Sequence, residues 1–249
     1  MSATVSAEWL ELREPADAAA RSEELAGRVA EHLGPGPHVI HDLGGGSGSM
    51  GRWLAPRLPG PQRWVVHDRD ERLLELAAGA FETRRSDITR LAPGDLAGAS
   101  LVTASALLDL LTREELDRML GACAGRPLLL ALTVVGRVSL SPAEPLDARL
   151  GAAFDEHQRR GGRLGPDAVA AAAGAVGEAE VIVRPSPWML GAADAGLAAE
   201  WLRGWVAAAC EQEPALAAEA GAYEERRLAQ AAAGELHVTV DHADLLVLP

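Results

Sequence analysis

A glycine-rich turn that follows a short apolar segment is the first feature of the sequence that could bind a ligand. Residues 42–51 read Asp-Leu-Gly-Gly-Gly-Ser-Gly-Ser-Met-Gly, and they begin at the last of the strand-like residues 38–42. Glycine lets the backbone approach a ligand closely, and the start of the following helix offers unpaired N–H groups with a positive dipole end. We therefore expect this turn to hold a charged or polar part of a small molecule.

Two ligand-binding patterns overlap in this turn. Residues 46–51 satisfy G-x-G-x-x-G, the dinucleotide-binding signature, whereas residues 42–48 satisfy D-x-G-x-G-x-G. Asp42 separates the two interpretations, because a carboxylate beside a pyrophosphate dianion is electrostatically unfavourable. The second pattern resembles the first motif of class I S-adenosylmethionine (SAM)-dependent methyltransferases, whose cofactor carries an ammonium and a sulfonium group.

Later positions extend the resemblance in the same order along the chain. Asp68, followed by Arg69, ends a second strand-like segment, where an acid accepts the ribose hydroxyls. Asp87-Ile88 resembles the position that meets the adenine, and Ser105 lies where the family encloses the methionine part. The resemblance implies SAM as cofactor and S-adenosylhomocysteine as product. The predicted cofactor-binding residues are Asp42, Gly44, Gly45, Gly46, Gly48, Asp68, Arg69, Asp87, Ile88 and Ser105.

Structural roles are alternatives for several of these residues. Asp68 could instead cap a helix over residues 71–80, and Asp87 could be an ordinary turn residue. Asp109 is equally compatible with a helix cap and with a pocket acid. His41 and His67 lie inside strands, and we expect both to be structural.

Candidate substrate residues follow the fourth and fifth strands, because ligands of open α/β sheets lie beyond the carboxyl ends of the strands. Asp109 and His157 are the candidate catalytic residues, as general bases for an acceptor that must lose a proton. Gln158 and Trp188 are the candidates for contact with the substrate. Trp201 and Trp205 follow each other at a helical step of four residues, which predicts core packing.

The alternation of strand-like and helix-like segments predicts βαβ units around a parallel sheet. Together with the resemblance, it implies an α/β fold with a doubly wound, mostly parallel, seven-stranded sheet, the Rossmann-like methyltransferase fold. Strands are expected over residues 38–42, 64–68, 83–87, 101–105, 128–135 and 180–184, and over 236–240 and 245–248 with a bend at Asp241-His242. Helices are expected over residues 8–33, 52–58, 71–80, 113–124, 146–160 and 166–176, and as two helices within 192–233, broken near Pro214.

We expect residues 1–249 to form a single domain, since this length supports one core. The N-terminal residues 1–36 would form a helical lid over a cofactor-binding half, residues 37–135. Residues 136–249 would form the substrate-side half, with a helical insertion at about residues 190–233.

The composition excludes several kinds of chemistry and partner. All 23 basic residues are arginine, and the chain contains neither Lys nor Asn. Lysine Schiff-base and P-loop chemistry are therefore excluded, as is the Asn-Pro-Pro-Tyr motif of some DNA and protein methylases. A net charge of −13 disfavours nucleic acid as a partner. Cys123 and Cys210 make no metal-binding spacing, so no metal is expected.

These observations predict a cytoplasmic enzyme that transfers a methyl group from SAM to a small-molecule O or N acceptor by direct in-line displacement. No apolar run reaches the ~18 residues of a membrane helix, and residues 1–13 lack the positively charged start of a signal peptide. Three alternatives stay open: an RNA methyltransferase with the same cofactor site, an NAD(P)-binding oxidoreductase, and a SAM-binding protein without turnover. The oligomeric state is left open.

Overall fold

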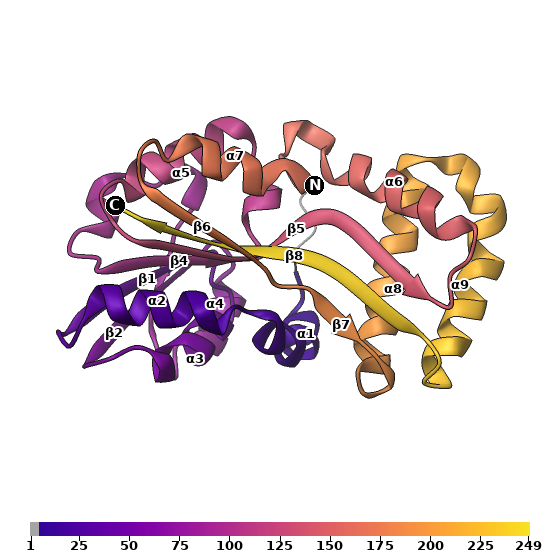
Figure 1. Ribbon diagram of the computed structural model, residues 1–249, viewed down its shortest axis with the longest axis horizontal. Helices are drawn as coiled ribbons and strands as arrows, with labels where there is room; N and C mark the ends of the chain where they lie inside the picture. Colours follow the sequence, from indigo (N-terminus) through magenta and orange to yellow (C-terminus); the bar gives the residue numbers. More distant parts are fainter. Residues whose placement is uncertain (1–4) are drawn as a thin grey trace.

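A central twisted sheet organises the computed structural model, which describes residues 5–249 (Figure 1). Its strands run in the order β3-β2-β1-β4-β5-β8-β6, and β7 pairs with β8 beside β6. Strands β1 to β5 pair in parallel, whereas β8 is antiparallel to β5, β6 and β7. The strands are β1 His38–Leu43, β2 Gln62–Asp68, β3 Glu82–Arg85, β4 Leu101–Ser105, β5 Leu128–Ser141, β6 Glu180–Pro185, β7 Trp188–Leu190 and β8 His237–Leu248.

Helices cover both faces of the sheet, which confirms the expected doubly wound α/β arrangement (Figure 1). On one face, apolar side chains of α2 (Glu23–Leu33) and α3 (Ser49–Leu54) pack on Ile40, Leu101 and Leu246. On the other face, α5 (Arg113–Cys123) and α7 (Ala168–Ala175) pack on Val102 and Leu245. A third, smaller core joins α4 (Glu71–Ala77) to β2 through Val66.

Strands β5 and β8 are longer than the rest of the sheet and continue into a group of three helices, which we call the cap (Figure 1). The cap consists of α6 (Leu146–Gln158), α8 (Ala195–Gln212) and α9 (Ala217–Ala232). Its core contains Trp201 and Trp205, whose rings stack with centroids 5.3 Å apart, together with residues from the outer halves of β5 and β8. The two helices expected on either side of Pro214 are α8 and α9.

The predicted bend at Asp241-His242 is wrong, because β8 is one continuous strand from His237 to Leu248. The irregularity lies instead in β5, whose register against β8 shifts after Leu130 and again after Val134. Leu132 there has a φ of 55°, in the left-handed region that non-glycine residues rarely adopt. A bulge of this kind bends a strand, and here it lies where β5 leaves the main sheet.

The expected single helix over residues 8–33 is also wrong. The segment forms α1 (Ala7–Ala20), which contains Pro15, and α2, separated at Arg21 and Ser22. Ser22 begins α2, since its side chain accepts a hydrogen bond from the Leu25 backbone N–H. The Ser22 backbone N–H in turn donates to the buried carboxylate of Asp244 at 2.8 Å. This contact joins residues far apart in the sequence and fixes the break between the helices.

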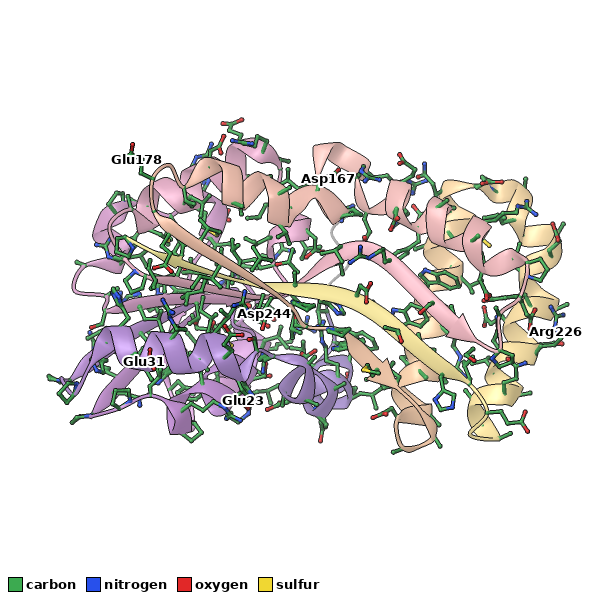
Figure 2. The ribbon with its side chains drawn as sticks, in the orientation of Figure 1. Glu23, Glu31, Asp167, Glu178, Arg226 and Asp244 are labelled. Carbon is green, nitrogen blue, oxygen red and sulfur yellow. The ribbon has the colours of Figure 1, made fainter. Side chains whose placement is uncertain are left out.

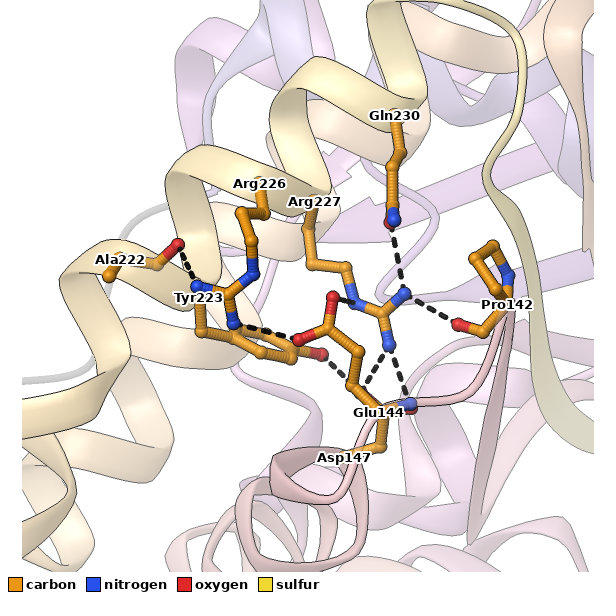
Figure 3. Close-up of polar contacts among 8 residues, drawn as sticks. All are labelled: Pro142, Glu144, Asp147, Ala222, Tyr223, Arg226, Arg227 and Gln230. Atoms are coloured by element: carbon orange, nitrogen blue, oxygen red, sulfur yellow. Dashed lines mark hydrogen bonds and ion pairs between the residues drawn. The ribbon is translucent and has the colours of Figure 1, made fainter.

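A buried arginine ties α9 to the start of α6 within the cap (Figure 3). Arg227 has no exposed surface, and its guanidinium donates to both carboxylate oxygens of Asp147 at 2.6 and 2.8 Å. It also donates to the Pro142 carbonyl, while the Tyr223 hydroxyl donates to Asp147. Because the charge is paired and hydrogen-bonded, its burial is tolerated and orients the two helices.

Most charged side chains lie on the outer surface, as Glu31, Glu178 and Arg226 do in Figure 2, whereas Asp244 lies in the interior on β8. Within residues 5–249, no helix is long and apolar enough to cross a membrane.

Candidate functional site

The glycine loop connects β1 to α3 at the carboxyl edge of the parallel strands. Gly44, Gly46 and Gly48 have positive φ angles of 62°, 52° and 83°, which side chains disfavour. Gly45 has a different constraint, because a Cβ there would lie 2.3 Å from Oδ2 of Asp42. The loop can therefore fold over Asp42 only with glycine at this position.

Asp42 is fully buried at the end of β1, beneath the glycine loop. Its Oδ1 accepts a hydrogen bond from the Thr103 hydroxyl at 2.7 Å, whereas its Oδ2 has no partner within the described chain. Burial raises the pKa of Asp42 to about 7, against the lowering effects of Thr103 and Arg21. A cationic group near the loop would stabilise the ionised carboxylate.

Asp68 lies at the end of β2, next to the glycine loop. Its Oδ2 accepts a hydrogen bond from the Gly46 N–H at 2.9 Å, and its Oδ1 accepts one from the Asp70 N–H. The cap of α4 is Asp70, whose side chain accepts from Arg72 N–H. Asp70, and not Asp68, therefore caps the helix, and Asp68 orders the glycine loop instead.

The remaining predicted cofactor residues lie at neighbouring strand ends. Asp87 is exposed and caps a short 3-10 turn through the Thr89 N–H and hydroxyl, so the turn-residue alternative describes its contacts. Ile88 is half-buried beside it, and Arg69 is close enough to lower the pKa of Asp87, after the larger effect of Thr89. Ser105 ends β4, where its hydroxyl accepts from Arg21 at 3.2 Å.

The helix α1 lies over the glycine loop. A Cβ at Gly46 would lie 3.2 Å from the side chain of Leu10 on α1, and one at Gly44 would lie 3.0 Å from Leu107, which follows β4. Two leucines from different segments thus cover the loop from outside. A ligand held by the loop would lie against these apolar side chains, shielded from solvent.

The polar side of α1 contacts the predicted substrate residue Trp188. Arg13 forms a two-point ion pair with the buried Asp17, at 2.9 and 3.1 Å. The Trp188 ring N–H donates to the same carboxylate at 3.0 Å, and the Arg13 guanidinium stands 4.9 Å from the Trp188 ring centre. Trp188 is almost fully buried and also packs against His242. Charge and cation–π contacts together hold α1 against β7.

Asp109 lies in the short turn after β4 and is largely buried. Burial raises the pKa of Asp109 to about 6, and the positive charges of Arg13 and Arg163 oppose that rise. Arg13 also contributes, after burial, to the lowered pKa of His242, which is about 4. Arg13 thus links α1, the Asp109 turn and β8 electrostatically. A buried carboxyl group with a raised pKa can accept a proton near neutral pH.

The other two substrate-side candidates lie on α6, with different surroundings. His157 forms a hydrogen bond with Glu211 on α8 at 3.3 Å, which places it in the contact between the two cap helices. Gln158 follows it, and its Oε1 is buried with no partner within the described chain. The contacts of His157 are those of a helix-packing residue, whereas Gln158 has an acceptor to offer a ligand.

An apolar pocket of about 240 Å³ opens between α1, α6 and α8. Its walls include Trp9 of α1 and Phe154 of α6, together with the stacked rings of Trp201 and Trp205. Trp9 is the neighbour of Leu10 in sequence, so consecutive residues of α1 contact this pocket and the glycine loop. Flat, apolar chemical groups fit such walls best.

Three charged residues of this region were not predicted as site residues, namely Asp17, Arg21 and Asp244. All three are buried, and Arg21 donates to the hydroxyls of Ser49 and Ser105. The sequence signals were a charge within the helical lid for Asp17 and Arg21, and a charge within an apolar final strand for Asp244. Arg21 and Asp244 belong to no local motif, because Ser105 and Ser22, their partners, lie far along the chain.

His41 and His67 form a buried pair, with Nδ1 of His41 2.8 Å from Nε2 of His67. Burial lowers the pKa of each to about 4, so both are neutral near pH 7. The second nitrogen of His67 bonds to Ser86. These contacts are those of structural histidines that join β1, β2 and the residue after β3.

Comparison with known proteins identifies the fold. No family model matches the sequence, and a search of curated proteins finds no significant match. The solved cyclopropane synthase MmaA2 from Mycobacterium tuberculosis is similar over 98% of this chain and 94% of its own, at 13% identity and a TM-score of 0.50. The chain therefore has the Rossmann-like methyltransferase fold, as its strand order also indicates.

Two further structures match at lower TM-scores. Phosphoethanolamine N-methyltransferase 2 of Haemonchus contortus matches 92% of this chain and 53% of its own, at 12% identity and a TM-score of 0.46. A zinc-dependent alcohol dehydrogenase from Rhodobacter sphaeroides matches 61% of this chain and 62% of its own, at 19% identity and a TM-score of 0.41.

Proposed function

We propose that the protein is a SAM-dependent methyltransferase that acts on a small-molecule O or N acceptor. The observation that carries this proposal is the pairing of a glycine loop with two acids, Asp42 beneath it and Asp68 beside it. The chain's methyltransferase fold and the net-cationic charge of SAM agree with it.

The residues present fit SAM. Asp42 offers an unpartnered carboxylate oxygen toward the cationic end of the cofactor, and Asp68 offers carboxylate oxygens toward the ribose hydroxyls. Arg69, Asp87, Ile88 and Ser105 stay proposed contacts at the ends of β2, β3 and β4. When bound, SAM supplies a methyl group that its sulfonium already activates.

The work of the chain's own residues would then be to orient the acceptor and to exclude water. Leu10 and Leu107 cover the loop, and the aromatic pocket that Trp9 helps to line would hold the apolar body of an acceptor. Orientation of this kind can supply a large part of a rate enhancement, on the order of 7–11 kcal/mol at best. Trp188 and Gln158 are the proposed contacts for its polar part.

Asp109 is the proposed general base for an acceptor that carries a proton. Its carboxyl group is buried after β4 with a pKa of about 6, so it is mostly ionised at neutral pH and can receive the acceptor's proton. His157 stays the second candidate, although its bond to Glu211 would have to break first.

Titration calorimetry with S-adenosylhomocysteine tests the proposal. We expect binding by the wild-type protein and a loss of at least tenfold in affinity for the Asp42→Ala, Asp68→Ala double variant. NADH and a short RNA are titrated separately. Binding of NADH in place of S-adenosylhomocysteine would replace the proposal with an oxidoreductase, and salt-dependent RNA binding would replace the small-molecule acceptor.

A further inference from the structure

A buried arginine with free donors lies beside the glycine loop. Arg21, at the end of α1, is only 3% exposed. One of its terminal nitrogens, Nη2, donates to the hydroxyls of Ser49 and Ser105, each at 3.2 Å. Its Nε and Nη1 are buried with no hydrogen-bond partner in residues 5–249. A buried cation with unused N–H groups is costly unless something pairs with it.

Two of the acids near Arg21 already accept hydrogen bonds from other groups. Asp17 is paired with Arg13 and Trp188, and Asp244 accepts from the Ser22 and Leu132 backbone N–H groups. Across the described chain, Arg21 forms no ion pair with any carboxylate at 4 Å or less. The charges of Asp17, Asp42 and Asp244 only oppose the lowering of the Arg21 pKa by burial. The guanidinium therefore lacks an anion.

The position of Arg21 matches one part of a ligand. Ser49 begins α3 directly after the glycine loop, and Ser105 ends β4, so Arg21 lies at the edge of the sheet where these two elements meet. Asp42 Oδ2, which lacks a donor, lies under the same loop. A cation and a carboxylate oxygen that both lack a hydrogen-bond partner close to one loop suit a zwitterion.

The side chain is also held in place before any ligand arrives. The Arg21 N–H bonds to the Asp17 carbonyl, and the next residue is fixed by Asp244. The guanidinium stands 5.7 Å from the Trp53 ring centre. An arginine that is preorganised in this way loses little freedom on binding.

We propose that Arg21 binds the α-carboxylate at the amino-acid end of the cofactor. This inference rests on the proposed function and names a contact that the glycine-loop motif does not contain. It makes Arg21 a specificity-determining residue, which distinguishes ligands with an amino-acid carboxylate from the same nucleoside thioether without one.

Paired calorimetric titrations test this assignment. The two probes are S-adenosylhomocysteine and its decarboxylated analogue, which keeps the nucleoside, the thioether and the amine. We expect wild-type protein to bind S-adenosylhomocysteine about 10- to 100-fold more tightly than the analogue, as a charge-assisted hydrogen bond predicts. Arg21→Met should lose that same factor for S-adenosylhomocysteine and bind both probes alike.

Controls separate folding effects from binding effects. Arg28→Met removes an exposed arginine of α2, which is paired with Glu180, and it should keep the wild-type preference. Arg21→Lys keeps the positive charge and should keep part of the preference. Equal affinity of the wild-type protein for the two probes overturns the assignment without any variant, and Arg21→Lys supplies the residue-specific test where Arg21→Met fails to fold.

The outcomes also separate the two proposals. Equal wild-type affinity for both probes overturns the role of Arg21 and leaves SAM binding intact. A preference that persists in folded Arg21→Met overturns it as well. If wild-type protein binds neither probe, the proposed function fails and the Arg21 assignment fails with it.

Discussion

At the scale of single residues, Asp42 governs the geometry of the candidate site. Its carboxylate bonds to Thr103 through one oxygen and lies directly under Gly45 with the other. The same carboxylate thus imposes glycine on the loop and supplies the loop with negative charge. The sequence motif reflects both requirements, steric and electrostatic.

Gly45→Ala should therefore damage both stability and binding. The new Cβ would lie 2.3 Å from Asp42 Oδ2, and the carboxylate has no room to move because it is fully buried. We expect a loss of about 1–3 kcal/mol in the free energy of unfolding by urea, with weaker S-adenosylhomocysteine binding. The exposed Gly79→Ala, which meets nothing within 4 Å, should change stability by less than about 0.5 kcal/mol. Equal effects of the two variants would contradict this account.

Asp42 should also give stability a specific pH dependence. Its pKa is raised by burial to about 7, so the folded protein keeps a proton that the unfolded chain releases above pH ~4. The contribution of Asp42 to stability therefore falls as pH rises from about 4 to 7 and is constant above that. Asp42→Asn cannot titrate. As pH rises across this range, wild type should therefore lose stability relative to Asp42→Asn. The loss in unfolding free energy should be up to about 1.4 kcal/mol per pH unit. A difference independent of pH would refute the assignment.

Asp109 leads to a prediction about rate. With a pKa of about 6, its carboxylate is the ionised, proton-accepting form above that pH. For a proton-bearing acceptor, kcat/KM should rise as pH increases through about 6 and then level off. Asp109→Asn should lower it by roughly 10²- to 10⁴-fold and leave S-adenosylhomocysteine affinity within about twofold. If Asp109→Asn keeps the wild-type rate and His157→Gln is inactive, the general base is His157 and not Asp109.

How much of the site the sequence predicts depends on the distance between partners. Asp42 and Asp68 are recognisable because each directly ends a strand next to a local motif. Arg21 is not, because its hydrogen-bond partner Ser105 lies 84 residues away and only folding brings the two together. Burial of a charge is a property of the tertiary structure, which residue type and spacing do not encode.

At the scale of elements, Asp244 connects segments from both ends of the chain. One of its oxygens accepts from the Ser22 N–H at the start of α2, and the other accepts from the Leu132 N–H in the β5 bulge. The break between α1 and α2 and the bend of β5 therefore share one carboxylate. Ser22, followed by Glu23 and Glu24, is a local helix-start signal, and the contact with β8 fixes the chain at this break.

Asp244→Ala should therefore cost more than an ordinary surface change. It leaves two buried backbone N–H groups without an acceptor, and we expect a loss of about 2–5 kcal/mol in the free energy of unfolding. Asp244→Asn keeps one acceptor oxygen, so its free energy of unfolding should lie between those of wild type and Asp244→Ala. Asp241→Ala is the control on the same strand, because it breaks only the exposed pair with Arg137 and should cost less than about 1 kcal/mol. Similar midpoints in urea for Asp244→Ala and Asp241→Ala would contradict this role.

At the scale of the whole molecule, β5 and β8 join the main sheet to the cap. Each strand is buried against α5 and α7 in one half and against α6 and α8 in the other. The sequence predicts the apolar run of β5 up to residue 135, where both faces are buried. The rest of β5 alternates in exposure and reads as a loop, because only the cap covers it. Continuous strands across two cores should make the cap and the sheet unfold together.

Arg227 and its exposed neighbour Arg226 allow a direct test of that cooperativity (Figure 3). Arg227→Met leaves Asp147 without its buried cation and should cost about 3–5 kcal/mol, whereas Arg226→Met breaks a surface pair with Glu144 and should cost about 0–1 kcal/mol. Amide hydrogen exchange at increasing urea measures α9 and β1 in the same sample. Because β8 runs from the cap into the main sheet, where it pairs with β5, both elements should lose protection at the same, lower urea concentration in Arg227→Met. If the amides of α9 alone lose protection earlier, while those of β1 stay as protected as in wild type, the cap unfolds independently of the sheet.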